Sequence, residues 1–266
     1  MPLEIFGYIA AVIMGITLGL VGAGGSILTV PVLVYLFSID AVLATTYALF
    51  IVGITGFTGS LRHINTGNIN LKTALLFGTP SIASVLITRA FVLPAIPAVL
   101  FTAGNLQVTK SIGILLFFAV IMLMASFSMI ARPIAVKPDD HPQRDSYFLS
   151  VIGLGVGFIT GLVGAGGGFL IIPALIFFAG LPMKKAVGTS LIIIAANSFI
   201  GFVSSLKHDA VIDWKFLILF SAMAIIGIIT GSALAKKIPG EKLKSAFGWF
   251  VLAMGVYIII KETVGR

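Results

Sequence analysis

The sequence predicts an all-α protein that crosses a membrane several times. Of its 266 residues, 59% are hydrophobic and only 10% are charged, and the mean hydropathy is +1.16. A soluble domain needs about a quarter charged residues to cover its surface, so most of this surface must face hydrocarbon. Several apolar runs approach or exceed the roughly 20 residues that cross a bilayer as a helix. A soluble α-helical protein would need polar helix faces, which this sequence lacks.

The first half of the chain contains five apolar segments, at residues 5–21, 27–37, 41–61, 71–93 and 108–130. Glu4, rather than a basic residue, precedes the first segment, which we therefore treat as part of the structure and not as a signal peptide. The second segment is short for a crossing and is interrupted by Pro31. Residues 94–104 carry Pro94 and Pro97 and are not expected to form a regular helix.

The second half repeats this order, with segments at residues 147–163, 169–178, 186–206, 214–235 and 243–260. A polar stretch of mixed charge that contains three prolines, residues 132–146, separates the two halves. The sequence therefore predicts a first membrane repeat at residues 1–131, a cytoplasmic linker at residues 132–146 and a second membrane repeat at residues 147–266.

A glycine-rich motif occurs once in each half, with a constant offset of 142 residues. It reads GLVGAGGSILTVPVL at residues 19–33 and GLVGAGGGFLIIPAL at residues 161–175, and ten of the fifteen positions are identical. Each glycine inside a helix costs about 1 kcal/mol relative to alanine. Two such breaks at matching places in two hydrophobic halves indicate internal duplication and a functional core with pseudo-symmetry.

Equivalent loops of the two halves carry opposite charge bias: the loop around Asp40 sums to −1, whereas its counterpart at Lys184 and Lys185 sums to +2. The loop at residues 62–72 has a formal charge of +2, whereas its counterpart at residues 207–215 sums to zero. Basic loops stay in the cytoplasm, which places residues 62–72, the linker, Lys184 with Lys185, and residues 236–244 there and both termini outside. The halves are therefore predicted to be inverted repeats. The first two segments of each half could be two crossings or one re-entrant hairpin, so eight to ten membrane segments are expected.

Each glycine-rich break is predicted to be an unwound turn that leads into the start of a helix. Pro31 and Pro173 are expected in the first turn of that helix, where no amide donor is needed. Free N–H groups and the positive end of the helix dipole then favour an anion. In a membrane, irregular backbone is tolerated only where it is buried in protein or lines a cavity. The residues predicted to bind substrate at the breaks are Gly22, Gly24, Gly25, Ser26, Thr29, Pro31, Gly164, Gly166, Gly167, Gly168 and Pro173.

Other glycines have a different explanation. Gly15 with Gly19, and Gly153 with Gly157 and Gly161, have the GxxxG spacing that lets two membrane helices pack closely, and we interpret them so. The run at the first break is a poor match to a dinucleotide-binding fingerprint, because its third glycine is replaced and no βαβ unit surrounds it.

The distribution of charge predicts the sign of the substrate. All nine acidic residues lie in loops or at segment ends, whereas cation carriers and proton relays place carboxylates within their spans. Arg89 has long apolar sequence on both sides, so it either binds an anion or extends to the membrane interface. Thr189, Ser190 and Asn197 are further candidates, which either contact the substrate or form hydrogen bonds between helices.

Several other classes of protein are excluded or disfavoured. The chain has no cysteine, and its three histidines have no metal-ligand spacing, so no cofactor or metal is expected. A membrane-embedded enzyme lacks the expected residues, because the predicted spans contain no His, Asp, Glu or Cys to act as base, nucleophile or metal ligand. The net charge of +8 suits contact with the anionic lipids of a bilayer and is no evidence for nucleic acid.

The two motifs, together with AVGTSL at residues 186–191, resemble the TauE/SafE family of sulfite exporters over nearly the whole chain. The resemblance implies a secondary carrier in the cell membrane for small anions such as sulfite, thiosulfate, sulfonates or carboxylates, with export as the family's direction. It carries over by position to the glycines and prolines of the two motifs: Gly22, Gly24, Gly25, Pro31, Gly164, Gly166, Gly167 and Pro173. The first copy departs from the second at residues 45–47, which argues against equal contributions from the two copies.

The sequence thus predicts a secondary transporter of small anions that works by alternating access of two inverted repeats. A passive anion channel built on the same breaks is the alternative, and a purely structural membrane protein would leave the duplicated breaks unexplained.

Overall fold

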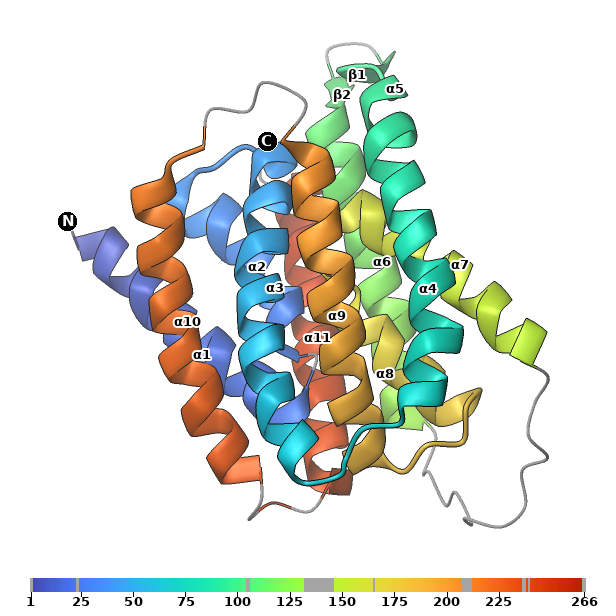
Figure 1. Cartoon of the computed structure of the whole chain (residues 1–266). Helices are drawn as coiled ribbons and strands as arrows, with labels where there is room; N and C mark the ends of the chain where they lie inside the picture. The colour runs from blue at the N-terminus through green and yellow to red at the C-terminus, as the bar shows by residue number, and fades with distance from the viewer. Residues whose placement is uncertain are drawn as a thin grey trace.

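Ten long or medium helices make up most of the chain in the computed structural model, which describes residues 2–22, 24–103, 106–131, 146–164, 166–206, 212–235, 238 and 240–264 (Figure 1). Five of these helices belong to the first half: α1 (Pro2–Val21), α2 (Gly24–Phe37), α3 (Ala41–Asn65), α4 (Leu71–Ile87) and α6 (Lys110–Ala131). The other five follow in the second half: α7 (Ser146–Val163), α8 (Gly168–Phe177), α9 (Met183–Ser205), α10 (Trp214–Leu234) and α11 (Gly240–Val264). The predicted order of segments is confirmed.

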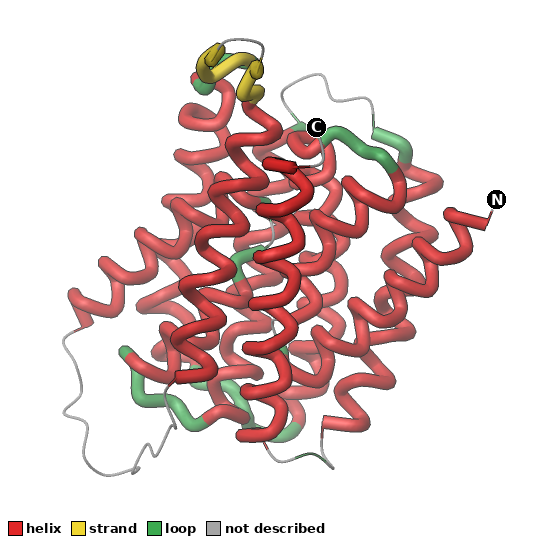
Figure 2. The backbone as a smooth tube through the Cα atoms, turned by 180° about the vertical axis from the view of Figure 1, so that it is seen from behind, coloured by secondary structure: helices red, strands yellow, loops and turns green. Residues whose placement is uncertain are grey.

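The connection after α4 is irregular, as the prolines predicted, but it has structure of its own. A wide π-helical turn, η1 (Thr88–Val92), continues α4 and is followed by the short α5 (Leu93–Ala95). The strands β1 (Val99–Ala103) and β2 (Leu106–Thr109) then pair as an antiparallel hairpin at one end of the bundle (Figure 2). The hairpin is not predicted from the sequence, because Pro94 and Pro97 indicate only where a helix stops.

Hydrophobic side chains cover the outside of the helices as well as the core. Six helices in the described part of the chain are long and apolar enough to cross a membrane. Large side chains such as Phe91, Phe127 and Ile229 are more than half exposed, which a soluble surface rarely shows on this scale. The fold is that of an all-α polytopic membrane protein, and the predicted multi-pass location is confirmed.

The two halves pack against each other in a reciprocal pattern. Helix α1 lies against α10, and its equivalent α7 lies against α4. At the centre, α3 crosses its own equivalent α9, and α6 lies along α11. A pseudo-two-fold relation between the halves produces such a pattern, because each contact then recurs with the roles of the halves exchanged.

The outer helix pairs are in backbone contact at the GxxxG glycines. A Cβ atom on Gly15 would collide with the Ala224 carbonyl of α10, and one on Gly157 would collide with the Ser81 carbonyl of α4. Gly19 and Gly153 are equally close to the backbone of the facing helix, and Gly161 lies against the Thr88 side chain of η1. The prediction that these glycines serve helix packing is confirmed.

Equivalent connections of the two halves lie at opposite ends of the bundle. In Figure 1 the connection between α2 and α3 is at the upper end, whereas the connection between α8 and α9 is at the lower end. The lower end also carries the connection between α3 and α4, with Arg62 and Lys72 near it. Two of the basic segments on which the predicted topology depends, residues 62–72 and Lys184 with Lys185, are therefore near that end, whereas the predicted linker lies outside the described residues except for Ser146.

Candidate functional site

The chain breaks between α1 and α2 and again between α7 and α8. Gly22 (φ 79°) ends the first helix of one half and Gly164 (φ 72°) that of the other, and Gly166 and Gly167 also have positive φ. This backbone conformation suits glycine, because side chains with a Cβ rarely adopt it. The N–H groups of Gly22 and Gly164 still close a last helical turn, at 2.7 Å and 2.8 Å from their acceptors. Both predicted breaks are confirmed.

The predicted position of the two prolines is wrong. Helix α2 begins at Gly24 and helix α8 at Gly168, so Pro31 and Pro173 lie inside these helices and not in their first turns. Nor does Pro31 interrupt the second segment, which is one continuous helix. The glycines complete the change of direction within a few residues, so the helix restarts before the proline. Each proline only leaves one carbonyl of the preceding turn without its usual donor.

Each break is held by the central helix of the other half. Gly22 lies against Val187 of α9, and Gly164 lies against Thr45 of α3. Val187 and Thr45 are equivalent positions with the same offset of 142 residues as the two motifs. A Cβ atom at either glycine would collide with this neighbour. Both the positive φ and the close approach therefore require glycine here.

Arg89 lies at the second break. Its side chain is 2% exposed, so it does not extend to the surface. A Cβ on Gly164 would collide with its Nη2 atom, and its Nη1 donates to the Ser205 hydroxyl at 3.4 Å. Its Nε and Nη2 have no hydrogen-bond partner among the described residues, and neither has the neighbouring Thr88 hydroxyl. We call Thr45, Thr88, Arg89, Gly164 and Ser205 the Arg89 site.

The π-helical turn positions Arg89. The Leu93 N–H bonds to the Thr88 carbonyl five residues earlier, which widens the turn that contains Arg89. Pro94, one residue further on, has no N–H to donate to the preceding turn, so a regular α-helix cannot continue here. Such single π turns inside helices occur frequently at functional sites. Pro94 is the sequence signal for this turn, although the proline alone does not specify a π turn.

Of the other predicted residues of the second break, only Gly166 is shown against the α3–α9 crossing. Gly166 faces Val52 and Ser198, and Gly167 lies against Thr160. Gly168 begins α8. The Ser198 hydroxyl is buried without a partner among the described residues. The second break therefore has one face toward Arg89 and another toward the centre of the bundle.

Asn197, at the middle of α9, has a structural partner. Its Nδ2 donates to the Ser81 hydroxyl of α4 at 2.8 Å, so the amide forms a hydrogen bond between two helices. Its Oδ1 is buried without a donor among the described residues. An oxygen acceptor cannot bind an anion. Of the two roles that the sequence leaves open, the structure thus supplies the contact between helices.

The remaining predicted residues are not brought to Arg89. Thr189 and Ser190 are 15 or 16 residues before Ser205 on α9, about 23 Å at 1.5 Å per residue. The Ser190 hydroxyl donates to the Val187 carbonyl within its own helix at 2.8 Å. In the first half, Thr29 on α2 is 2.9 Å from the sulfur of Met14. Gly24, Gly25 and Ser26 form the first residues of α2, and Ser26 is fully buried.

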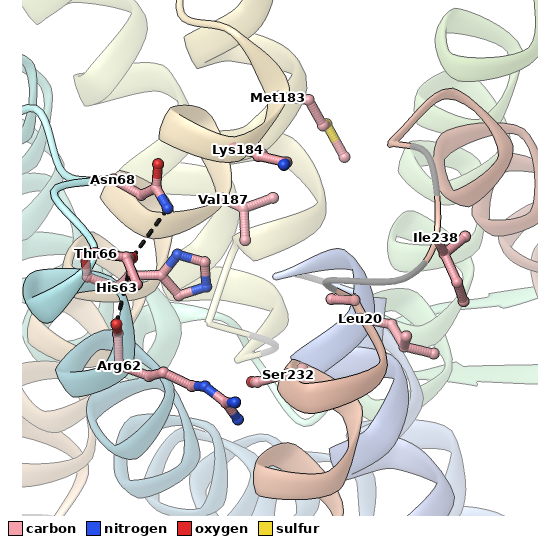
Figure 3. Close-up of a pocket in the computed structure, with 12 residues that line it drawn as sticks. Leu20, Arg62, His63, Thr66, Asn68, Met183, Lys184, Val187, Ser232 and Ile238 are labelled. Atoms are coloured by element: carbon pink, nitrogen blue, oxygen red, sulfur yellow. Dashed lines mark hydrogen bonds between the residues drawn. The ribbon is translucent and has the colours of Figure 1, made fainter.

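A pocket of about 250 Å³ borders the first break (Figure 3). Val187, which contacts Gly22, and Leu20 form part of its wall. Its polar lining comes from α3, the loop after α3, α9 and α10: Arg62, His63, Thr66, Asn68, Lys184 and Ser232. We call this the basic pocket. The sequence does not predict it, because its residues come from separate segments that meet only in the folded chain.

The loop after α3 closes one side of the basic pocket. Asn68 lies so close to α9 that a Cβ on Gly188 would collide with the Asn68 carbonyl. The Asn68 side chain donates to the Thr66 hydroxyl at 2.9 Å, which holds the loop in shape (Figure 3). Among the described residues, no group of three or more His, Asp or Glu is arranged to hold a metal ion.

Comparison with known proteins gives a consistent result. A family model described as sulfite exporter TauE/SafE matches residues 8–258. A probable membrane transporter protein of Xylella fastidiosa is 30% identical over 253 residues, which cover 93% of this chain and 91% of that protein. The probable membrane transporter protein YunE of Bacillus subtilis is 28% identical over 276 residues, covering 95% of this chain and 97% of that protein. No solved structure matches.

Proposed function

Because the chain belongs to the sulfite exporter TauE/SafE family of membrane transporters, we propose that it is a secondary transporter that exports small anions, such as sulfite or sulfonates, across the cell membrane. The family and the relatives are membrane transporters and not enzymes.

The buried charge of Arg89 is the observation that carries the proposal. The six apolar spans contain no aspartate or glutamate, so no acid within them can neutralise this guanidinium. A buried charge without a partner costs several kcal/mol in a protein. A bound anion would offset that cost. The sign of the charge at the break therefore favours an anionic substrate.

The free atoms of Arg89 also have the right arrangement. Nε and Nη2 lie on one edge of the planar guanidinium, and their N–H groups form the two-pronged donor that binds two oxygens of an oxyanion together. The buried hydroxyl of Thr88, the preceding residue, is a further donor without a partner among the described residues. The start of α8, which follows the same break, adds the positive end of a helix dipole. Sulfite and sulfonates present three oxygens to such a set.

Alternating access of two inverted repeats is the mechanism that we propose. The reciprocal packing of the halves and the opposite placement of equivalent connections support it. The lower end in Figure 1, which carries Arg62, Lys72, Lys184 and Lys185, would face the cytoplasm, because basic segments stay on that side. Transporters of this design bind the substrate beside broken helices.

Flux of labelled sulfite in proteoliposomes tests the proposal. We expect saturable flux by the full-length protein and acceleration of efflux by unlabelled sulfite on the opposite side. A passive anion channel, the alternative on the same breaks, would show neither saturation nor this acceleration. Absence of flux for sulfite, thiosulfate, sulfonates and short carboxylates alike would contradict the transport of small anions.

A further inference from the structure

We infer that the basic pocket is a second binding site for a small oxyanion, at the opposite end of the molecule from the Arg89 site. The inference rests on the proposed function, because it concerns the same class of anion. The basic pocket is a different site from the Arg89 site, and it is not predicted from the sequence. Arg62, Lys184 and Ser232 are its proposed binding residues.

The pocket has the donors that an oxyanion needs. Figure 3 shows the Arg62 guanidinium extending toward Ser232, with His63 and Lys184 on the facing side of the same space. The Arg62 Nη1 atom is 3.4 Å from the Ile229 carbonyl of α10, which holds the guanidinium at the wall. Among the described residues that line the pocket there are two permanent cations and no carboxylate. The charged side chains among these described residues are therefore all basic.

Ser232 provides the deepest donor. Its side chain is 6% exposed, yet it lines the pocket, and its hydroxyl has no hydrogen-bond partner among the described residues. A buried hydroxyl without a partner is costly, and a ligand oxygen in the pocket would satisfy it. The volume of about 250 Å³ holds a sulfonate together with several waters of about 30 Å³ each.

The basic pocket occupies the position in one half of the chain that is equivalent to the Arg89 site in the other half. Ser232 corresponds to Arg89 with an offset of 143 residues, and Val187 corresponds to Thr45 with an offset of 142. The basic pocket beside Gly22 is thus the counterpart of the Arg89 site beside Gly164. Arg89 brings a guanidinium to its own site, whereas Ser232 brings only a short hydroxyl side chain to an open pocket. The missing positive charge is supplied by Arg62 and Lys184 instead.

The phosphate of a lipid headgroup has the same chemistry as a small oxyanion. We assign the pocket to the small, freely diffusing anion, because a donor as buried as Ser232 lies deeper than the cations at the pocket wall. Labelling of the variant Ser232→Cys with a maleimide distinguishes the two sources, because the reaction should be slowed by whichever of the two, a soluble anion or a lipid, binds in the pocket.

Binding to the purified full-length protein in a neutral detergent is the first test. Isethionate, an unreactive sulfonate, should raise the midpoint of thermal unfolding of the wild type. Arg62→Gln and Lys184→Gln should each weaken the apparent affinity by about tenfold or more, as expected for a lost hydrogen bond to a charged group. Lys185→Gln is the matched control, because Lys185 is the next residue on α9 and does not line the pocket. Equal affinity in all four proteins would overturn the inference.

The absence of cysteine from the chain permits a second test that does not depend on those variants. A single cysteine in Ser232→Cys should react with a membrane-impermeant maleimide, and isethionate should slow the reaction. The cysteine of Lys185→Cys should react at the same rate with and without isethionate. Protection by phosphatidylglycerol vesicles but not by isethionate would assign the pocket to lipid and overturn the inference.

The two proposals can fail separately. If the wild type carries sulfite but isethionate protects neither cysteine, the pocket is not an anion site and the proposed function stands. If isethionate protects Ser232→Cys but no anion is transported, the pocket binds the anion and the proposed function fails.

Discussion

The backbone amide of Asn70 donates a hydrogen bond to the hydroxyl of Thr189, with 3.0 Å between the nitrogen and the oxygen. Asn70 also caps α4 through its side chain. In the other half, the Asp213 amide donates to the Tyr47 hydroxyl at 2.7 Å, and Asp213 caps α10. The residue that caps an outer helix is thus fixed, in each half, by the central helix of the other half.

Replacing Thr189 with valine should destabilise the protein without removing a substrate contact. The Asn70 amide would lose its acceptor, which costs about 1–3 kcal/mol in a buried site. We expect a lower midpoint of thermal unfolding for Thr189→Val and a midpoint near that of the wild type for Thr189→Ser. Sulfite flux per folded molecule should stay near the wild-type value. Loss of flux at unchanged stability would return Thr189 to the substrate site that the sequence predicts.

Replacing Arg89 with methionine should separate binding from stability. Methionine keeps much of the side-chain volume but removes a buried charge, two of whose nitrogen atoms have no hydrogen-bond partner among the described residues. The free energy of unfolding without anion should therefore stay the same or rise. Flux of sulfite should fall by about 100-fold or more, because two hydrogen bonds to a charged group are lost.

A purely structural Arg89 gives the opposite result. Arg89→Met would then lower the thermal midpoint, and flux per folded molecule would persist. Lys185→Met is the control for removing a positive charge, because this lysine is exposed and lies outside both sites.

Replacing either of two glycines of α7 with alanine should change the free energy of unfolding, but in opposite directions. A Cβ on Gly157 would collide with the Ser81 carbonyl, so Gly157→Ala should cost about 1–3 kcal/mol. Gly155, two residues away, has nothing within 4 Å of such a Cβ, so Gly155→Ala should stabilise by about 0.5–1 kcal/mol. Thermal unfolding of both variants in one detergent measures the difference. Equal effects would mean that α7 does not pack on α4 through this face.

Labelling of single cysteines from one side of the membrane should test the inverted topology. Ser38 and Lys185 are exposed residues at the α2–α3 and α8–α9 connections, which are equivalent in the two halves. In intact cells an impermeant maleimide should label Ser38→Cys at once and Lys185→Cys only after the membrane is permeabilised. Labelling of both from the same side would contradict the inversion.

The sequence is sufficient to predict the order of the helices, the duplication and the two breaks. These features depend on local composition, because apolar length defines a span and clustered glycines define a break. Equivalent positions such as Gly22 and Gly164 can be paired from the sequence alone, since their offset is constant.

The geometry of the sites cannot be predicted in the same way. The basic pocket needs the end of α3, the start of α9 and the end of α10 to meet, and no local pattern encodes that meeting. The predicted position of Pro31 is wrong because the sequence does not tell how quickly the glycines turn the chain. For Thr189 the sequence leaves a substrate contact and a hydrogen bond between helices both open, because a polar residue in an apolar segment has the same appearance in either role; its bond to the Asn70 amide is evident only in the fold.

The backbone contacts at Gly15 and Gly157 have a consequence for how the molecule can change shape. Where two helices touch backbone to backbone, no side chain can yield, so α1 must travel with α10 and α7 with α4. At the crossing of α3 and α9 the approach is less close: a Cβ on Gly53 would lie 3.3 Å or more from the Phe199 ring, and one on Gly56 would lie 3.4 Å or more from α9. The bodies that move past each other would then each be assembled from both halves of the chain, with the sliding surface at the α3–α9 crossing.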